Sequence, residues 1–197
     1  MKRREKPAET TPELDKDRRD DDSLWKDIVE RFFYPMLKRA IPTLYADAET
    51  KTLPRFLDKE LKKATYRLRG GKRSVDLLAE VPLKDGSSEW VLLHIEIQGR
   101  GGGRLPFRMA YYRALIFAMY KREAAALAIV TEKRSKDEPK FYESELYNTS
   151  VVYRYNRLVV QELDEGELLA SDNPFDLALC AAQRALKSRR DERQKHA

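Results

Sequence analysis

The chain has 197 residues, the length of one domain of ordinary size, and it is 42% hydrophobic and 37% charged. No run of about 18 apolar residues is present to span a membrane, and residues 1–22 lack the apolar stretch of a signal peptide. One cysteine excludes a disulfide framework and a cysteine-based zinc site, and two histidines argue against a histidine-rich metal site. We therefore expect a soluble, cytoplasmic protein in which carboxylates are the candidate metal ligands.

The positive charge is unevenly distributed along the chain, whose formal net charge is +6. Residues 184–197 hold six Lys or Arg and two Asp or Glu, whereas residues 1–22 hold seven basic and eight acidic residues. This basic end is either a solubilising helix terminus or an arm that contacts phosphates. Because the centre of the chain is nearly balanced, charge alone does not identify nucleic acid as the partner.

The N-terminal part predicts a charged segment followed by a helix. Residues 1–22 lack apolar periodicity, so we expect them to be disordered. Asp22 or Ser23 can cap a helix whose apolar pattern continues to Met36. Pro35 should kink this helix or split it in two, because proline lacks a backbone N–H and clashes with the preceding turn.

Three strands are predicted in the next segment. They are expected at Thr65–Arg69, Arg73–Pro82 and Glu89–Gln98, after a short helical turn at Asp58–Lys63. Asp85 and Gly86 indicate a hairpin between the second and the third strand.

The second half predicts a helix, a buried strand, a strand pair and a last helix. The first helix should run from Pro106 to about Arg122, and the continuous apolar run Ala125–Thr131 is typical of a strand covered on both faces. The remaining elements are expected at Ser150–Tyr155, at Leu158–Leu163 and after the N-cap Asn173, with Pro174, Phe175, Ala178, Leu179, Ala182 and Leu186 in the last helix. This order predicts an α/β fold with a mixed sheet.

The strand Glu89–Gln98 places polar groups on an otherwise apolar face. Side chains alternate along a strand with period two, so His94, Glu96 and Gln98 share one face. Asp76 lies in the preceding strand, between two apolar residues. Glu96 and Asp76 are therefore acids on neighbouring strands of a predicted hairpin.

The loop of that hairpin decides whether the two acids meet. If Lys84–Ser88 form an odd-numbered loop, Asp76 lies directly opposite Glu96. If only Asp85 and Gly86 form the loop, the two acids lie on opposite faces unless a bulge restores them. We predict the odd-numbered loop or the bulge.

Two adjacent carboxylates on a rigid sheet repel each other, and a divalent cation relieves that repulsion. Mg²⁺ or Mn²⁺ would take one or two carboxylates, waters and phosphate oxygens as ligands, and Gln98 could orient a water or a phosphate. The other interpretation is structural: Asp76 and Glu96 are solvated or form ion pairs with Arg69, Arg73 or Arg108.

The chain also resembles a known family. The stretches FLDKEL, VDLLAEVPLKDGSSEWVLLHIEIQG, RMAYYRALI, YNTSVVYRYN and DNPFDLAL resemble the Rpn-type proteins, which are recombination-promoting nucleases or transposases of the PD-(D/E)XK nuclease superfamily. The resemblance covers about residues 23–188. It implies a core of αβββαβ type and metal-dependent cleavage of phosphodiester bonds.

The resemblance also assigns roles to individual residues. Asp76 and Glu96 match the family's metal-binding acids, and Gln98 stands where the superfamily most often has lysine. A further acid often comes from upstream of the core strands. Glu60, in FLDKEL, and Glu30, on the first helix, both qualify by position, and we rank Glu60 first.

Basic and aromatic side chains on the helix after the third strand are the candidate nucleic-acid contacts. They are Arg104, Arg108 and Tyr112, with Arg108 as the principal one. The apolar face of that helix is predicted to consist of Phe107, Tyr111, Ala114, Leu115 and Ala118. His94 shares the face of Glu96 and is either a ligand or a structural group, and Cys180 is expected in the core.

We therefore expect a disordered segment at 1–22, one PD-(D/E)XK nuclease-like domain at 23–188 and a basic tail at 189–197. The predicted function is that of an endonuclease that uses Mg²⁺ or Mn²⁺ to hydrolyse DNA. A homodimer would supply the two active sites that coordinated cutting of two strands usually needs. The alternative is a catalytically degenerate nuclease-fold protein that binds nucleic acid or a protein partner.

Overall fold

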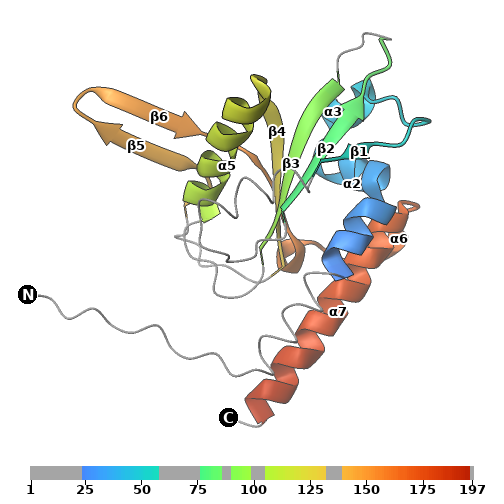
Figure 1. The fold of residues 1–197 in the computed structure, drawn as a ribbon. Helices are drawn as coiled ribbons and strands as arrows, with labels where there is room; N and C mark the ends of the chain where they lie inside the picture. Colours follow the sequence, from blue (N-terminus) through green and yellow to red (C-terminus); the bar gives the residue numbers. More distant parts are fainter. Residues whose placement is uncertain (1–23, 58–75, 86–89, 99–104, 132–138, 196–197) are drawn as a thin grey trace, which may run out of the picture.

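The computed structural model describes five stretches of the chain, 24–57, 76–85, 90–98, 105–131 and 139–195 (Figure 1). The expected disordered segment at 1–22, the helical turn at Asp58–Lys63 and the strand at Thr65–Arg69 lie outside these residues. The other expected elements fall wholly or largely within the described stretches.

A five-stranded mixed sheet forms the centre of the described protein. Its strand order is β1-β2-β3-β4-β7, in which β1 pairs antiparallel with β2, β2 antiparallel with β3, β3 parallel with β4, and β4 parallel with β7. The strands are β1 (Arg55–Phe56), β2 (Asp76–Pro82), β3 (Trp90–Gln98), β4 (Ala124–Val130) and β7 (Asn156–Val159). The predicted α/β class with a mixed sheet is confirmed.

The first helix is divided near Pro35, as predicted. Residues 24–31 are helical, Phe32 interrupts the helix, and α2 (Phe33–Ala40) follows. Pro35 lies in the first turn of α2, where its missing N–H costs no hydrogen bond. A short helix, α3 (Pro42–Asp47), continues toward β1.

Helices cover both faces of the sheet (Figure 1). Helix α2 and the last helix, α7 (Pro174–Lys195), pack on one face, where odd-numbered residues of β3 and β4 join the largest apolar cluster. Helix α5 (Leu105–Tyr120) packs on the other face, against even-numbered residues of the same strands. Burial on both sides explains the continuous apolar run of β4, whose last five residues are all buried.

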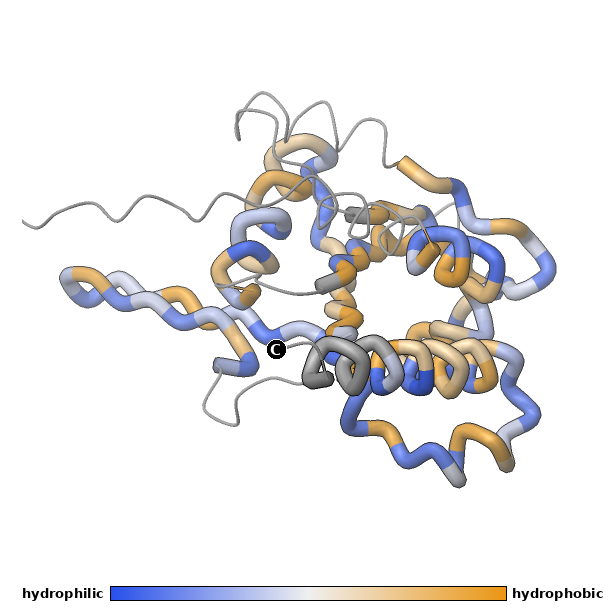
Figure 2. Tube along the Cα trace, turned by 90° about the horizontal axis from the view of Figure 1, so that it is seen from below, coloured by the Kyte–Doolittle hydropathy of each residue, from blue (hydrophilic) through white to orange (hydrophobic). Residues whose placement is uncertain are grey.

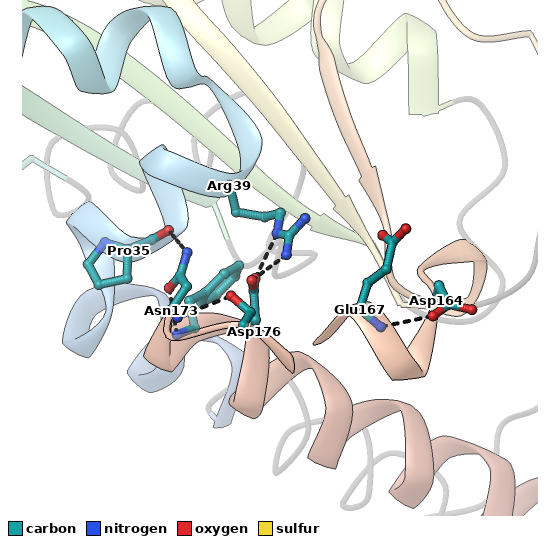
Figure 3. A network of polar contacts seen from close by, with 8 residues as sticks. Pro35, Arg39, Asp164, Glu167, Asn173 and Asp176 are labelled. Carbon is teal, nitrogen blue, oxygen red and sulfur yellow. Dashed lines mark hydrogen bonds and ion pairs between the residues drawn. The ribbon is translucent and has the colours of Figure 1, made fainter. Parts of the chain in front are cut away.

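Polar contacts at its N-terminus hold α7 against α2 (Figure 3). Asn173 caps α7 as predicted, because its side-chain oxygen accepts a hydrogen bond from the backbone N–H of Phe175 at 3.0 Å. Its amide donates to the carbonyl of Pro35 at 3.0 Å. Asp176, which is 1% exposed, pairs with the guanidinium of Arg39 on α2. Together these contacts orient α7 across the sheet.

A two-stranded hairpin stands apart from the main sheet. It consists of β5 (Tyr142–Leu146) and β6 (Thr149–Tyr153), and it extends away from the other described elements (Figures 1 and 2). The predicted strand pair is therefore wrong in its partners: residues 150–153 of the first predicted strand pair with β5, which was not predicted. The second predicted strand, Leu158–Leu163, divides into the end of β7 and a 3-10 turn, η1 (Val160–Glu162).

Two further features differ from the sequence-based expectation. A short helix, α6 (Glu165–Ala170), precedes α7, and its N-cap Asp164 accepts a hydrogen bond from the backbone N–H of Glu167 at 2.9 Å (Figure 3). Helix α7 continues to Lys195, past the predicted domain end at residue 188. No helix among the described residues is long and apolar enough to cross a membrane.

Candidate metal centre

The backbone register places the two predicted acids opposite each other. Asp76 and Glu96 are Cα partners in the antiparallel pair β2–β3, and the register continues to Pro82 and Trp90 at the hairpin end. Direct partners in an antiparallel pair lie on the same face of the sheet. This is the register of the odd-numbered loop, which confirms that prediction. Asp76 and Gln98 are described here as backbone positions on β2 and β3.

The side chain of Glu96 is buried beneath α5. It is 1% exposed, and its Oε1 lies 2.7 Å from Nη2 of Arg108, whose side chain is 19% exposed. Arg108 was predicted both as a substrate contact and, in the structural interpretation, as an ion-pair partner of these acids. The structure places it at the site and in contact with Glu96. Both groups have lost most of their hydration. Their mutual attraction offsets that loss only because the two charged groups lie within hydrogen-bond distance.

His94 lies beside Glu96 on the same face of β3. It is 1% exposed, and neither ring nitrogen has a hydrogen-bond partner in the part of the chain that the structure describes. Its ring centroid lies 5.0 Å from that of Tyr112, which is fully buried. Burial, and then the positive charge of Arg108, lowers the pKa of His94 from 6.5 to about 3. The imidazole is therefore neutral at neutral pH.

Apolar side chains enclose these polar groups on both sides along the sheet. One cluster contains Leu57, Leu78, Leu92 and Ile116, and the other contains Leu105, Met109, Ala126, Ala128 and Val130. On β4, the partners of His94 and Glu96 are Ala126 and Ala128 of the second cluster, and on β2 the partner of His94 is Leu78 of the first cluster. Both alanines are themselves buried, at 4% exposed for Ala126 and 0% for Ala128.

The row of residues that contains the two acids continues across the sheet to an arginine. Ala128 on β4 is the partner of Glu96, and Arg157 on β7 is the partner of Ala128. Arg157 therefore lies on the α5 face, two strands from Glu96. Sequence reasoning missed it because the predicted strand began at Leu158, and because pairing between β4 and β7 is a long-range contact without a local signal.

The remaining predicted site residues are not all brought to this centre. Glu60 and Arg104 lie outside the described residues. Glu30 pairs with Lys26 at 3.3 Å on the helix of residues 24–31, which packs on the opposite face of the sheet from Glu96. The structure thus places Glu30 away from Glu96, and Glu60 stays the first-ranked prediction for the auxiliary acid.

The predicted apolar face of α5 is wrong. The buried residues of the helix are Leu105, Pro106, Met109, Tyr112 and Ile116, whereas Phe107 is 47% exposed. Tyr112, predicted as a nucleic-acid contact, has no exposed surface and packs on His94 instead. Arg108 lies one turn before Tyr112 on the helix, so the two residues do reach the same centre.

The donor set of this centre suits a hard divalent cation. Carboxylates at positions 76 and 96 are the ligand type that Mg²⁺ and Mn²⁺ prefer. The buried imidazole of His94, whose nitrogens accept or donate no hydrogen bond among the described residues, is a further potential ligand. Among the described residues, no three His, Cys, Asp or Glu side chains form a group that could hold a metal ion. The side chain of Asp76 is not among these, because Asp76 is described as a backbone position only, and a metal here would need it beside Glu96.

Comparison of the chain with protein-family models, with curated proteins and with solved structures finds no match. The function is therefore argued from the residues and from the geometry of this centre.

Proposed function

We propose that the protein is a metal-dependent DNA endonuclease of the recombination-promoting or transposase type, with a PD-(D/E)XK nuclease fold. The observation that carries the proposal is the register that makes Asp76 and Glu96 direct partners on β2 and β3. Carboxylates on directly paired strand positions repel each other, and a divalent cation offsets that repulsion. The expected cation is Mg²⁺ or Mn²⁺.

The order of the described elements supports the same fold. An antiparallel pair, β2–β3, is followed by a helix that covers one face, and then by β4, which pairs parallel with β3. These elements correspond to the second half of the αβββαβ core implied by the resemblance, and the divided first helix corresponds to its beginning. Both acids lie on the strands on which that core carries its metal ligands.

Each residue of the centre has a defined task in phosphodiester hydrolysis. Asp76 and Glu96 would hold the cation, which when bound lowers the pKa of a water and offsets negative charge on the phosphate. Gln98 would donate hydrogen bonds that orient the attacking water or a phosphate oxygen. Arg108, already beside Glu96, and Arg157, in the same row, would provide positive charge for the phosphate group.

A nicking assay tests the proposal. Purified protein is incubated with supercoiled plasmid and either Mg²⁺, Mn²⁺ or EDTA, beside Asp76→Asn, Glu96→Gln and Glu143→Gln. Glu143 lies exposed on β5, away from the centre, and serves as the matched control. We expect metal-dependent nicking that falls at least about 100-fold in the first two variants and is unchanged in the third. Equal cleavage by the wild type and Asp76→Asn would overturn the catalytic assignment.

A second candidate function is a catalytically degenerate protein that binds nucleic acid. The contact between Arg108 and Glu96 favours it, because a guanidinium already offsets the charge of that carboxylate, and Gln98 replaces the usual lysine. Calorimetry separates the two candidates. A binder without a metal centre gives no heat of Mn²⁺ binding that depends on Glu96, while its DNA affinity falls steeply with salt.

A further inference from the structure

His94 is a polar side chain whose burial is not explained by the hydrogen bonds of the fold. A neutral imidazole carries one N–H donor and one lone-pair acceptor. His94 is 1% exposed, and neither Nδ1 nor Nε2 has a hydrogen-bond partner among the described residues. Buried polar groups are nearly always satisfied, so an unsatisfied one points to a water, an ion or a ligand that completes it.

The sheet neighbours of His94 cannot supply that partner. Its cross-strand partners are Leu78 on β2 and Ala126 on β4, and both are apolar. Tyr112 contacts the ring from α5 with a centroid distance of 5.0 Å. The nearest acid on its own strand is Glu96, two residues further along the same face.

This spacing suits shared coordination of one cation. Residues i and i+2 of a strand are about 6.6 Å apart on one face. A cation with ligand bonds of about 2 Å fits between an imidazole and a carboxylate at that separation, since both side chains can lean toward it. Asp76 is the Cα partner of Glu96 on the neighbouring strand, so the three positions are neighbours in the sheet.

We propose that His94 supplies a nitrogen ligand to the divalent cation of this centre, and that it makes the centre prefer a transition-metal ion such as Mn²⁺ over Mg²⁺. The inference rests on the metal centre of the proposed function. Imidazole nitrogen binds transition metals much better than it binds Mg²⁺, which takes oxygen ligands. A site with two carboxylates alone has no such preference for nitrogen-binding ions.

Electron spin-echo spectroscopy of Mn²⁺ bound to the full chain tests this directly. The wild type should show the coupling of a histidine ¹⁴N, which changes when histidine is labelled with ¹⁵N. His196 is the other histidine of the chain, so His196→Ala is the matched control and should keep the signal. His94→Phe should lose it, and calorimetry should show about a 10-fold or greater loss of Mn²⁺ affinity with Mg²⁺ affinity changed less than about 3-fold.

The outcomes separate this inference from the proposed function. Mn²⁺ binding that depends on Glu96 but carries no histidine coupling in the wild type overturns the role of His94 and leaves the metal centre intact. No Glu96-dependent Mn²⁺ binding at all overturns both. Because the spectroscopy is performed on the wild type, the test does not depend on whether His94→Phe folds.

Discussion

Nη2 of Arg108 on α5 lies 2.7 Å from Oε1 of Glu96 on β3. This contact joins the helix to the strand that carries the candidate metal ligand, and it places a positive charge beside a carboxylate that is 1% exposed. Without a bound cation, Arg108 offsets the charge of Glu96. We therefore expect the stability of the metal-free protein to depend on this contact.

Arg108→Gln should destabilise the metal-free protein, because it removes a cation from beside a buried carboxylate. The expected loss in the free energy of unfolding is about 3 kcal/mol, measured by urea denaturation in EDTA. Arg113→Gln is the matched control on the same helix: its partner Glu123 is exposed, so its loss should stay below about 1 kcal/mol.

Saturating Mn²⁺ should then stabilise Arg108→Gln more than it stabilises the wild type, because the ion restores positive charge beside Glu96. An equal shift of the two melting temperatures would show that the metal does not bind at Glu96. A loss in Arg108→Gln no larger than in Arg113→Gln would show that the buried pair is not stabilising.

Arg39→Gln should destabilise the protein in a pH-dependent manner. Burial would raise the pKa of Asp176, but hydrogen bonds from Arg39 and Ser171 and the charges of Arg39 and Lys38 outweigh it and hold the pKa below its ordinary 3.8. The ionised form of Asp176 therefore adds stability that is full above about pH 4 and is lost as the pH falls through the folded-state pKa.

The expected cost of Arg39→Gln at pH 7 is about 3 kcal/mol, since a buried carboxylate loses its partner. The cost should shrink below about pH 4, as Asp176 becomes protonated in the variant. Urea denaturation across pH 3–7 measures both effects. Arg184→Gln, whose partner Glu165 is a surface residue of α6, is the control and should change stability little at any pH. A pH-independent cost would contradict the assignment to Asp176.

Lys121→Gly should stabilise the end of α5. Lys121 follows the last helical residue with φ of 55°, and its backbone N–H donates to the carbonyl of Phe117 at 2.8 Å. This left-handed position at a helix C-terminus favours glycine, which has no Cβ. The expected gain is about 1 kcal/mol by thermal or urea denaturation. Lys121→Ala keeps the Cβ and should gain nothing, so equal gains for both variants would disprove the explanation.

Tyr147→Asn should stabilise the β5–β6 hairpin. Tyr147 and Asn148 form its two-residue turn with φ of 47° and 61°, the geometry that favours Asn and Gly at both positions. The side chain of Tyr147 is 93% exposed, so its removal loses no packing. We expect about 5-fold greater protection of the hairpin amides from hydrogen exchange, equivalent to about 1 kcal/mol. Tyr147→Ala should give no such increase.

Local rules explain the elements that sequence reasoning predicted correctly. The division of the first helix near Pro35, the Asn173 cap of α7 and the alternating faces of β3 each depend on residues within one or two turns of the chain. These signals act over short distances, so they are readable without knowledge of the fold.

The buried face of α5 could not be predicted in this way. The helix is apolar almost all around, so its periodicity does not distinguish the face that packs on the sheet. Phe107 was predicted to be buried and is 47% exposed, while Tyr112 is fully buried. Only the position of α5 over β3 decides this, and that position depends on how the connecting segments bring helix and sheet together.

The sequence by itself indicated the candidate metal ligands, because period-two alternation places His94 and Glu96 on one face of β3 and the only cysteine, Cys180, is distant in the sequence. The tertiary structure decided the rest. It selected the register that pairs Asp76 with Glu96, brought Arg108 against Glu96, and placed Arg157 in the same row. Alternation is a property of one strand, whereas register and helix docking are set by loop length and by packing between distant segments.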